Sequence, residues 1–188
     1  TSSRLPGKVL MEAVDNVSML EFMIERIQKA SLIDGIIVAT TINDSDDPIA
    51  ALCNRLSVPC YRGSEEDVLL RVLEAHRSIN SSIIVELTGD CPLIDPAIID
   101  EVVQVYLDNE YDFVSNGHVR SYPDGLDVGI FSVDLLDEVE KKTNDPYDRE
   151  NVSSYIYRSG KYSLESVVAG EELFWPDLRI TLDDTGDY

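Results

Sequence analysis

The stretch Ile83-Ile84-Val85-Glu86-Leu87-Thr88-Gly89-Asp90-Cys91-Pro92-Leu93 decides the fold. Its first five residues are apolar except for Glu86, and three of them are β-branched, which is the pattern of a strand buried on both faces. A polar loop follows, and Asp95-Pro96 then begins a helix, because aspartate caps helices and proline suits the first helical position. The stretch therefore predicts a strand–loop–helix unit of a parallel sheet.

The same alternation continues in both directions along the chain. Before the stretch we expect a helix capped by Ser18, strands at 36–39 and 60–61, and helices that begin at Asp47-Pro48 and at a cap on Ser64. After it we expect strands at 113–115, 128–131, 162–168 and 179–182, and helices around 135–139 and from Asp145-Pro146 to Ile156. Alternating strands and helices predict an α/β protein whose parallel sheet is covered by helices.

A single domain is expected for residues 1–188. The chain has 44% hydrophobic residues and no internal repeat, low-complexity tract or linker, so it can bury one sizeable core. The strand–helix rhythm changes after Ser115, where residues 116–127 are polar and rich in turn formers. We interpret residues 116–160 as an elaboration that binds an acceptor or supports dimerisation.

Charge excludes two classes of partner. Fifteen Lys and Arg residues stand against 36 Asp and Glu residues, a formal net charge of −21. Such a field repels nucleic acid and anionic membrane surfaces. No apolar run reaches the ~20 residues of a membrane span, and the first residues lack the apolar stretch of a signal peptide. We therefore expect a cytoplasmic protein.

Metal sites built on thiolate or imidazole are also not expected. Cys53, Cys60 and Cys91 are odd in number and never spaced C-x-x-C, which excludes a disulfide framework and a thiolate zinc site. His76 and His118 are the only histidines, and the sequence assigns a role to neither.

The predicted topology indicates where a ligand binds. In open parallel sheets, ligands lie beyond the carboxyl ends of the strands. Residues 40–47, 62–64 and 88–95 then share one edge of the sheet, and residues 1–8 join them if a strand precedes that segment.

Phosphate-binding chemistry is concentrated in the first of these segments. The hydroxyls of Ser2 and Ser3, the guanidinium of Arg4 and the ammonium of Lys8 lie within eight positions of a very acidic chain. Backbone N–H groups in a turn with cations alongside can cradle a polyphosphate. The alternative is a frayed terminus with ordinary solvated charges.

Two carboxylates are candidate ligands for Mg²⁺, which takes one or two protein oxygens plus phosphate oxygens. Asp90 follows the decisive strand directly, although it could equally stabilise a turn. Asp183 follows the expected strand 179–182, although a solvated acidic tail is a strong alternative in this chain. The loop with Tyr122, Asp124 and Asp127 could hydrogen-bond sugar hydroxyls or form a simple surface turn.

Together these segments resemble the cytidylyltransferase family that makes CMP-activated sugars, most nearly its SpsF-type branch, which is named for spore coat polysaccharide biosynthesis and related to CMP-Kdo and CMP-acylneuraminate synthetases. Five stretches in family order carry the resemblance: Ser3-Arg4-Leu5-Pro6-Gly7-Lys8, Arg62-Gly63-Ser64-Glu65-Glu66-Asp67-Val68, Thr88-Gly89-Asp90-Cys91-Pro92-Leu93-Ile94-Asp95, Tyr122-Pro123-Asp124-Gly125-Leu126-Asp127-Val128 and Asp145-Pro146-Tyr147-Asp148-Arg149-Glu150.

The resemblance implies a nucleotide-diphospho-sugar transferase fold, a three-layer αβα sandwich around a mostly parallel mixed sheet. It also implies that CTP and a sugar give a CMP-sugar and pyrophosphate, for surface or spore-coat polysaccharides. Arg4, Lys8 and Asp90 would be catalytic, and Asp90 and Asp183 would hold Mg²⁺. By the same resemblance, Ser2, Ser3, Arg4, Lys8, Arg62, Ser64 and Asp90 would bind the nucleotide, and Tyr122, Asp124, Asp127 and Arg149 the sugar.

Three features depart from the family pattern. The chain starts inside the first loop, without the strand that precedes it in the family. Asp184-Thr185-Gly186-Asp187 replaces the usual Thr-Pro-Glu-Asp, and Gly129 stands where relatives often have an acidic residue. Relatives often dimerise, and the apolar and aromatic content of residues 147–157 would allow a homodimer here.

Two other functions stay open at this point. A glycosyltransferase of the same fold would use a D-x-D metal motif, and Asp44-Ser45-Asp46 has that spacing. A non-catalytic nucleotide-binding domain would bind CTP without turnover. Neither G-x-G-x-x-G nor a Walker sequence occurs, so dinucleotide enzymes and P-loop NTPases have little support.

Overall fold

The fold, obtained as a computed structural model, is described for residues 4–188. The first half contains β1 (Glu12–Val14), β2 (Val17–Ser18), α1 (Met19–Ile27), β3 (Val38–Thr41), α2 (Asp47–Leu56), β4 (Cys60–Gly63), α3 (Val68–Ser78) and β5 (Ile83–Glu86). The second half contains α4 (Pro96–Leu107), β6 (Phe113–Ser115), β7 (Gly129–Ser132), α5 (Val133–Glu140), α6 (Pro146–Glu150), α7 (Ser154–Arg158) and β8 (Leu164–Ser166). Three short 3₁₀ turns are η1 (Lys8–Leu10), η2 (Asp44–Asp46) and η3 (Glu171–Leu173).

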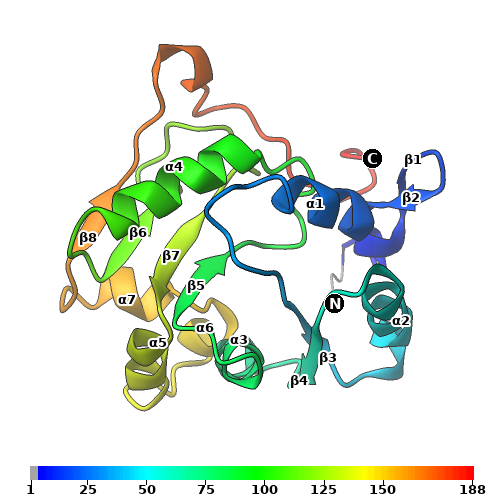
Figure 1. Cartoon of the computed structure of the whole chain (residues 1–188), viewed down its shortest axis with the longest axis horizontal. Coiled ribbons are helices and arrows are strands. Elements are labelled where there is room, and N and C mark those ends of the chain that lie inside the picture. Colours follow the sequence, from blue (N-terminus) through cyan, green and yellow to red (C-terminus); the bar gives the residue numbers. More distant parts are fainter. Residues whose placement is uncertain (1–3) are drawn as a thin grey trace.

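The central sheet is mixed, and most of its strands run in one direction. Its order is β5-β7-β6-β8. Strand β7 is antiparallel to both β5 and β6, whereas β6 and β8 are parallel, so only β7 is reversed. Strands β3 and β4 form a separate parallel pair, which lies beside β5 in Figure 1. The predicted α/β class with a mostly parallel mixed sheet is confirmed.

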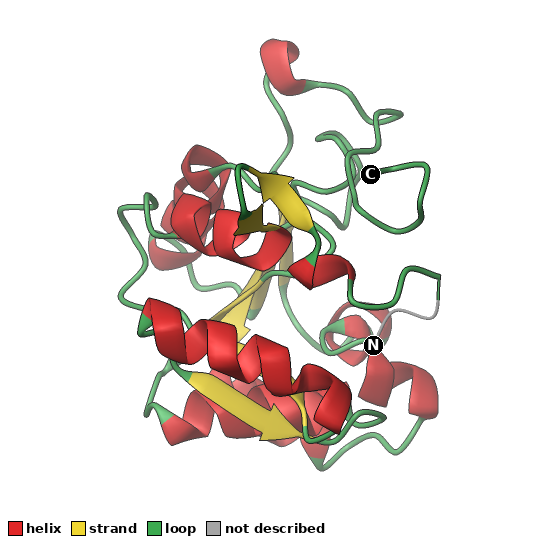
Figure 2. Cartoon of the chain, turned by 90° about the vertical axis from the view of Figure 1, so that its right-hand side faces the viewer, coloured by secondary structure: helices red, strands yellow, loops and turns green. Residues whose placement is uncertain are grey.

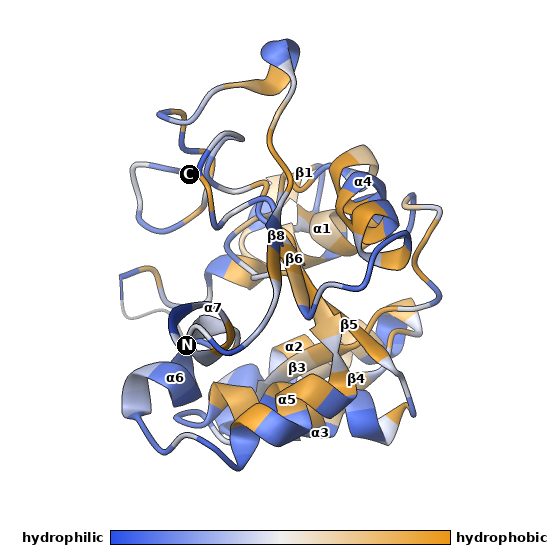
Figure 3. Ribbon diagram, turned by 90° about the vertical axis from the view of Figure 1, so that its left-hand side faces the viewer, coloured by the Kyte–Doolittle hydropathy of each residue, from blue (hydrophilic) through white to orange (hydrophobic). Residues whose placement is uncertain are grey.

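Helices cover both faces of this sheet because its strands are apolar on both sides. Along β6 and β7, Phe113 and Phe131 pack into one core cluster, while their neighbours Val114 and Ile130 pack into the other. The first cluster includes buried side chains of α3, α5 and α7, and the second those of α1 and α4. Figure 3 shows the apolar strands between these helices. The result is the predicted three-layer αβα arrangement.

Helix capping follows the sequence at Ser18, Asp95 and Asp145 and differs at two helices. Asp47 is the first residue of α2 and not its cap, and Asp46 stands at the N-cap without a capping side-chain bond. Ser18 Oγ accepts a hydrogen bond from Glu21 N (3.3 Å), and an Asp95 carboxylate oxygen accepts one from Ala97 N (2.8 Å). The cap predicted at Ser64 is wrong. Asp67 caps α3 by accepting from Leu70 N (3.0 Å), because Ser64 Oγ instead accepts from the backbone N–H of Asp67 and forms a turn ahead of the helix.

The helix predicted from Pro146 to Ile156 is two short helices, α6 and α7. Asn151 has φ −111° and ψ 81°, outside the helical region, and it ends α6. Its side chain donates to Tyr147 O (2.9 Å), which gives that carbonyl a partner at the helix end. The break turns α7 so that Ile156 is fully buried beneath the sheet.

Residues 179–182 do not form a regular strand. One isolated parallel bridge joins Asp124 and Arg179, and the flanking bonds are Asp124 N to Leu178 O and Ile180 N to Asp124 O, both 2.8 Å. Leu182 N then donates to Asp90 O (2.8 Å). The segment is therefore extended, and it is held to the loop after β5 and to the loop before β7.

Residues 116–160 are part of the sheet layer, since they contribute β7 between β5 and β6. Within the segment 147–157, Val152 and Ile156 are buried in the core, whereas Tyr147 is 55% exposed. Exposed apolar side chains gather instead on a segment that projects from the molecule (Figures 1 and 2), namely Leu173, Phe174, Trp175 and Leu178. Within the described residues, no helix is both long and apolar enough to cross a membrane.

Candidate active site

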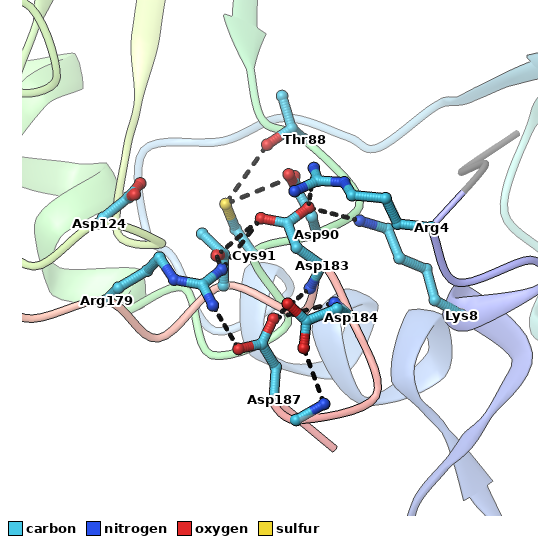
Figure 4. Close-up of polar contacts among 12 residues, drawn as sticks. Arg4, Lys8, Thr88, Asp90, Cys91, Asp124, Arg179, Asp183, Asp184 and Asp187 are labelled. Carbon is cyan, nitrogen blue, oxygen red and sulfur yellow. Dashed lines mark hydrogen bonds and ion pairs between the residues drawn. The ribbon is translucent and has the colours of Figure 1, made fainter.

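Cations near the start of the chain meet an aspartate near its end. Arg4 Nη2 lies 3.0 Å from Asp183 Oδ1, and Lys8 Nζ lies 3.2 Å from the same oxygen. The Lys8 and Asp183 side chains are 13% and 15% exposed, whereas Arg4 is 67% exposed. Figure 4 shows these side chains converging with Asp90 on one space. The structure thus brings together the predicted phosphate-binding cations and both predicted metal ligands.

The first loop is shaped to present Lys8 to this space. Leu5 is buried and fixes the loop to the body of the protein. Gly7 has φ +73°, a left-handed conformation that favours glycine, and precedes the 3₁₀ turn that begins at Lys8. Leu10 N donates to Gly7 O (2.8 Å) and closes this turn. The predicted nucleotide-binding residues Ser2 and Ser3 lie outside the described residues.

Asp183 is a structured anion and not part of a solvated tail. Its second oxygen, Oδ2, accepts from Thr181 Oγ1 (3.0 Å) and Arg179 Nη1 (3.2 Å). Asp187 Oδ2 in turn accepts from the backbone N–H of Asp183 (2.7 Å) and of Asp184 (3.0 Å). Burial opposes ionisation of Asp183, but the donors from Thr181 and Lys8 outweigh it, and the pKa of Asp183 is lowered.

Asp90 is held beside the segment that carries Asp183 by a backbone hydrogen bond, and its side chain contacts the thiol of Cys91. Its carbonyl accepts from Leu182 N, one residue before Asp183. Cys91 Sγ lies 3.7 Å from Asp90 Oδ1 and 3.3 Å from Thr88 Oγ1. Burial raises the pKa of the Cys91 thiol to about 12, and the negative charges of Asp90 and Asp127 add to this effect. Cys91 therefore stays a neutral packing group.

The donor set fits a divalent cation that is shared with a phosphate ligand. Carboxylate oxygens are the ligands that Mg²⁺ prefers, and it usually takes one or two of them together with phosphate oxygens. Among residues 4–188, no group of three or more histidine, cysteine, aspartate or glutamate side chains is arranged to hold a metal. Asp90 and Asp183 would therefore supply two ligands, and the substrate would complete the coordination.

A cavity of about 480 Å³ opens beside the Asp90 loop. Its walls come from β5, β6 and β7 and from the turn between α6 and α7. The lining residues are Val68, Glu86, Thr88, Phe113, Ser115, Gly117, His118, Asp127, Val128, Gly129, Glu150, Asn151, Val152, Ser153 and Tyr157. Thr88 connects the two features, because it lines the cavity and also contacts Cys91 next to Asp90. The cavity therefore adjoins the loop that carries Asp90.

Glu86 is the most unusual group in this cavity. It lies on β5 opposite Gly129 of β7. Burial raises the pKa of Glu86 from 4.5 to about 7, while a hydrogen bond with the side chain of Ser153 acts in the opposite direction. In its protonated form such a carboxyl group can donate a hydrogen bond to a ligand, and in its ionised form it accepts one.

Of the predicted sugar-binding residues, only Asp127 lines the cavity, and its Oδ1 also accepts from Arg120 Nη1 (2.6 Å). Tyr122 is wholly buried, and its hydroxyl donates to Glu101 Oε2 (2.9 Å). It therefore packs in the core of this structure. The Asp124 side chain is paired with Arg120, beside its backbone pairing with residues 178–180.

Arg149, the fourth of these residues, forms an ion-pair network away from the cavity lining. It donates to both carboxylate oxygens of Asp67, the cap of α3, and to the carbonyl of Glu140 at the end of α5 (3.1 Å). Its guanidinium joins α3, α5 and α6, which accounts for an arginine at this position without a ligand.

The weaker nucleoside candidates, Arg62 and Ser64, lie at the predicted edge of the sheet but are engaged in local structure. Arg62 donates to Thr41 O (2.9 Å) and Asn43 O (2.8 Å) and pairs with Asp47. These bonds tie β4 to the loop after β3. The structure does not bring either residue into contact with the Asp183 cluster.

The D-x-D sequence at 44–46 is also structural. Asp46 is 5% exposed, and its Oδ2 accepts from Thr40 Oγ1 (2.7 Å), Thr41 Oγ1 (2.6 Å) and Thr41 N (3.0 Å). Burial opposes ionisation, but these donors prevail and lower the pKa of Asp46. A carboxylate that is saturated in this way anchors the end of β3 and has no free oxygen pair for a metal.

Sequence reasoning missed Glu86 and Ser153 and assigned no role to His118, which lines the cavity with its ring centroid 5.4 Å from that of Tyr157. One signal was available for Glu86, since it is the only charged residue in an otherwise apolar strand. No local signal marks Ser153 or His118, because only the tertiary fold brings them to β5.

Comparison with known proteins identifies the class. The chain aligns over its whole length with the solved structure of a cytidylyltransferase from Leptospira borgpetersenii, with a TM-score of 0.92, 33% sequence identity and 79% of that chain covered. The fold is that of a nucleotidyltransferase.

The family follows from sequence. A family model described as cytidylyltransferase matches residues 1–172, and the chain belongs to this family of nucleotidyltransferases. It is 30% identical to the spore coat polysaccharide biosynthesis protein SpsF of Bacillus subtilis, covering all of this chain and 79% of that protein. It is also 29% identical to 3-deoxy-manno-octulosonate cytidylyltransferase of Geobacter metallireducens, covering 84% and 70% of the two chains.

Proposed function

We propose that this protein transfers CMP from CTP to a sugar hydroxyl with release of pyrophosphate, and that the product serves surface polysaccharide synthesis. Family membership supports the nucleotide and the reaction type. The observation that carries the site assignment is the convergence of Lys8 and Arg4 on Asp183, beside Asp90. Cations next to paired carboxylates form a site for a metal-bound triphosphate.

The cations have an anionic partner before substrate binds. Lys8 and Arg4 both contact Asp183 Oδ1. When a triphosphate enters, these two side chains exchange the carboxylate for phosphate oxygens, and the exchange releases Asp183 Oδ1 to coordinate a cation. This arrangement keeps Lys8 positioned and limits the reorganisation that binding requires.

Asp90 and Asp183 would hold the metal, and Mg²⁺ is the ion that this donor set favours. When bound, Mg²⁺ neutralises charge on the phosphate oxygens. Positioning and charge neutralisation are the main requirements of in-line attack by a hydroxyl on phosphorus. Lys8 and Arg4 would stabilise the departing pyrophosphate, which matters especially in a protein with a net charge of −21.

The test is CTP-dependent pyrophosphate release with Mg²⁺ and a panel of neutral, amino and acidic sugars. It compares the wild type with Asp90→Asn, and exposed Asp108→Asn is the matched control. We expect Asp90→Asn to lose activity by about 100-fold or more, as when an electrostatic group in an active site is removed. Equal rates for Asp90→Asn and wild type would reject the metal role of Asp90.

Two competing functions predict different results. A glycosyltransferase would release nucleoside diphosphate from a nucleotide-sugar, but the engagement of Asp46 with β3 removes the D-x-D observation that favoured it. A non-catalytic domain would bind CTP with Mg²⁺ in calorimetry and release no pyrophosphate with any sugar.

A homodimer stays a prediction. If one forms, the exposed apolar side chains on the projecting segment, Leu173, Phe174, Trp175 and Leu178, are better placed for it than residues 147–157. Light scattering of the wild type and of Trp175→Ser would test this assignment. A dimer that is unchanged by the substitution would argue against the projecting segment.

A further inference from the structure

The lining of the cavity beside the Asp90 loop combines apolar and polar side chains. Phe113, Val128 and Val152 contribute apolar surface, and Tyr157 contributes a ring. Hydroxyl and amide groups from Thr88, Ser115, Asn151 and Ser153 lie around them. A ring or chain with one apolar face and several hydroxyl groups matches this combination.

The charge of the lining is one-sided. Three carboxyl side chains, those of Glu86, Asp127 and Glu150, line the cavity, and no lysine or arginine appears among the lining residues in the described part of the chain. His118 is the one side chain there that could become cationic.

Arginines close to the cavity in sequence are paired with carboxylates of the protein, one of which, Asp127, itself lines the cavity. Arg120 pairs with Asp124 and Asp127. Arg158 pairs with Asp145 and with the buried Asp148. Arg149 is committed to Asp67 and Glu140, as described above. None of these guanidinium groups is available in the cavity to receive a carboxylate from a ligand.

Gly129 keeps the space in front of Glu86 open. A Cβ atom at position 129 would lie 3.5 Å from Glu86 Oε2 and 3.4 Å from Phe113 Cε2. These are ordinary contact distances, so a methyl group fits without a clash. It would also occupy the space through which a ligand reaches the Glu86 carboxyl group.

We infer that the cavity binds the acceptor, and that the acceptor is a neutral or amino-bearing sugar or polyol without a carboxylate. Its hydroxyl or ammonium groups would hydrogen-bond to Glu86 and Asp127. A carboxylate would be placed among three carboxyl groups, of which Asp127 is paired with Arg120, and no lysine or arginine stands among the described lining residues. Such like-charge contacts are strongly unfavourable. This inference rests on the proposed CMP transfer, because only that reaction makes the bound sugar an acceptor. The inferred acceptor differs in class from the octulosonate, an acid, that appears in the name of the relative from Geobacter metallireducens.

The test uses three probes that share one pyranose ring and differ in charge: glucosamine, glucose and glucuronate. Saturation-transfer NMR at tens of millimolar ranks their binding to the full chain, whether or not any of them is turned over. We expect glucosamine to bind at least as well as glucose, and glucuronate at least about tenfold more weakly. Glu86→Gln should weaken glucosamine about tenfold and narrow the gap to glucuronate.

Gly129→Ala assigns any binding to this cavity, because its methyl group occupies the space before Glu86. We expect it to reduce the signals of glucosamine and glucose, while exposed Gly170→Ala leaves them unchanged. Glucuronate that binds as well as glucosamine, signals that Gly129→Ala does not alter, or no signal from any probe would each overturn the inference.

Calorimetry with CTP and Mg²⁺ separates this inference from the proposed function. If the wild type binds CTP but prefers glucuronate, the inferred acceptor class is refuted and the proposed nucleotide is not. Loss of CTP binding in the wild type refutes the proposed nucleotide, whichever sugar the cavity selects.

Discussion

Lys8 Nζ and Asp183 Oδ1 lie 3.2 Å apart, although 175 positions separate the two residues in the chain. Both side chains are mostly buried, so their interaction is screened less by solvent than a surface ion pair. The contact joins the start of the chain to its last segment and assembles the candidate triphosphate site.

Replacing Lys8 should weaken nucleotide binding. Lys8→Ala removes a charge-assisted hydrogen bond to the triphosphate, and we expect CTP with Mg²⁺ to bind about 10- to 100-fold more weakly. Lys8→Arg should retain part of the affinity because the charge is kept. Calorimetry measures both variants, and Lys141→Ala, which removes an exposed surface ion pair, is the control. Unchanged affinity in Lys8→Ala would contradict the assignment.

Replacing Asp183 should separate nucleotide binding from metal dependence. In Asp183→Asn, Lys8 and Arg4 lose their competing carboxylate, so metal-free CTP should bind at least as tightly as in the wild type. The gain in affinity on adding Mg²⁺ should fall about tenfold or more because a metal ligand is lost. CTP titrations with Mg²⁺ or with a chelator measure the two quantities, and exposed Asp177→Asn serves as the control. A normal Mg²⁺ effect in Asp183→Asn would rule out its role as a ligand.

The turn at Gly125 should matter because it supports the segment that carries Asp183. Gly125 has φ +111°, and an added Cβ atom would lie 3.0 Å from backbone atoms of Ile180 and Thr181. Gly125→Ala should therefore destabilise the protein by about 1–3 kcal/mol and weaken CTP binding as residues 180–183 shift.

Gly160→Ala is the matched control for this change. Gly160 also has a positive φ, +66°, but an added Cβ atom would meet nothing within 4 Å. Thermal unfolding should show a smaller loss, of about 1 kcal/mol, with CTP affinity intact. Equal CTP affinities in the two variants would separate Gly125 from the site.

The stability of the protein should reflect the burial of Glu86. Burial raises its pKa from 4.5 to about 7, so the folded state keeps a proton that the unfolded state loses between these values. The free energy of unfolding of the wild type therefore falls, through this group, as the pH rises from about 4.5 to above 7. Glu86→Gln has no such loss, and its stability relative to wild type should rise by about 3 kcal/mol between pH 4.5 and pH 8.5.

Denaturant unfolding at several pH values measures this difference for Glu86→Gln. The quantity compared is the difference in unfolding free energy between each variant and wild type at each pH. Any effect of the substitution that does not depend on pH is the same at every point and does not alter the trend. Exposed Glu172→Gln is the control and should show no such trend. If the difference in unfolding free energy between Glu86→Gln and wild type does not change with pH, the Glu86 carboxyl group is well solvated.

Local patterns predicted most of the elements because their causes are local. Aspartate before proline at 95–96 began α4, and the β-branched run Ile83-Ile84-Val85 marked β5. The segment 179–182 has the composition of a strand, yet it forms only an isolated bridge. Strand formation requires a partner backbone in register along several residues, and no sequence window contains that partner.

The candidate site also has a part that the sequence predicted and a part that long-range contacts decided. Residue type and position made Arg4, Lys8, Asp90 and Asp183 candidates, with a solvated or turn role as the alternative for each. The resemblance to the cytidylyltransferase family then selected them. Arg149 has equally suggestive chemistry, but its guanidinium joins three helices. Which polar group faces a ligand and which serves packing depends on long-range contacts, as the burial of Tyr122 also illustrates.

The sequence by itself determined the alternation of strands and helices, the acidic charge and the chemical groups available near the strand ends, because these depend on composition and short-range spacing. Only the tertiary structure decided that residues 4, 8, 90 and 183 meet and that Glu86, Asp127 and Ser153 share a cavity. The physical reason is that these contacts join segments far apart in the chain, and packing of the whole core fixes their relative positions.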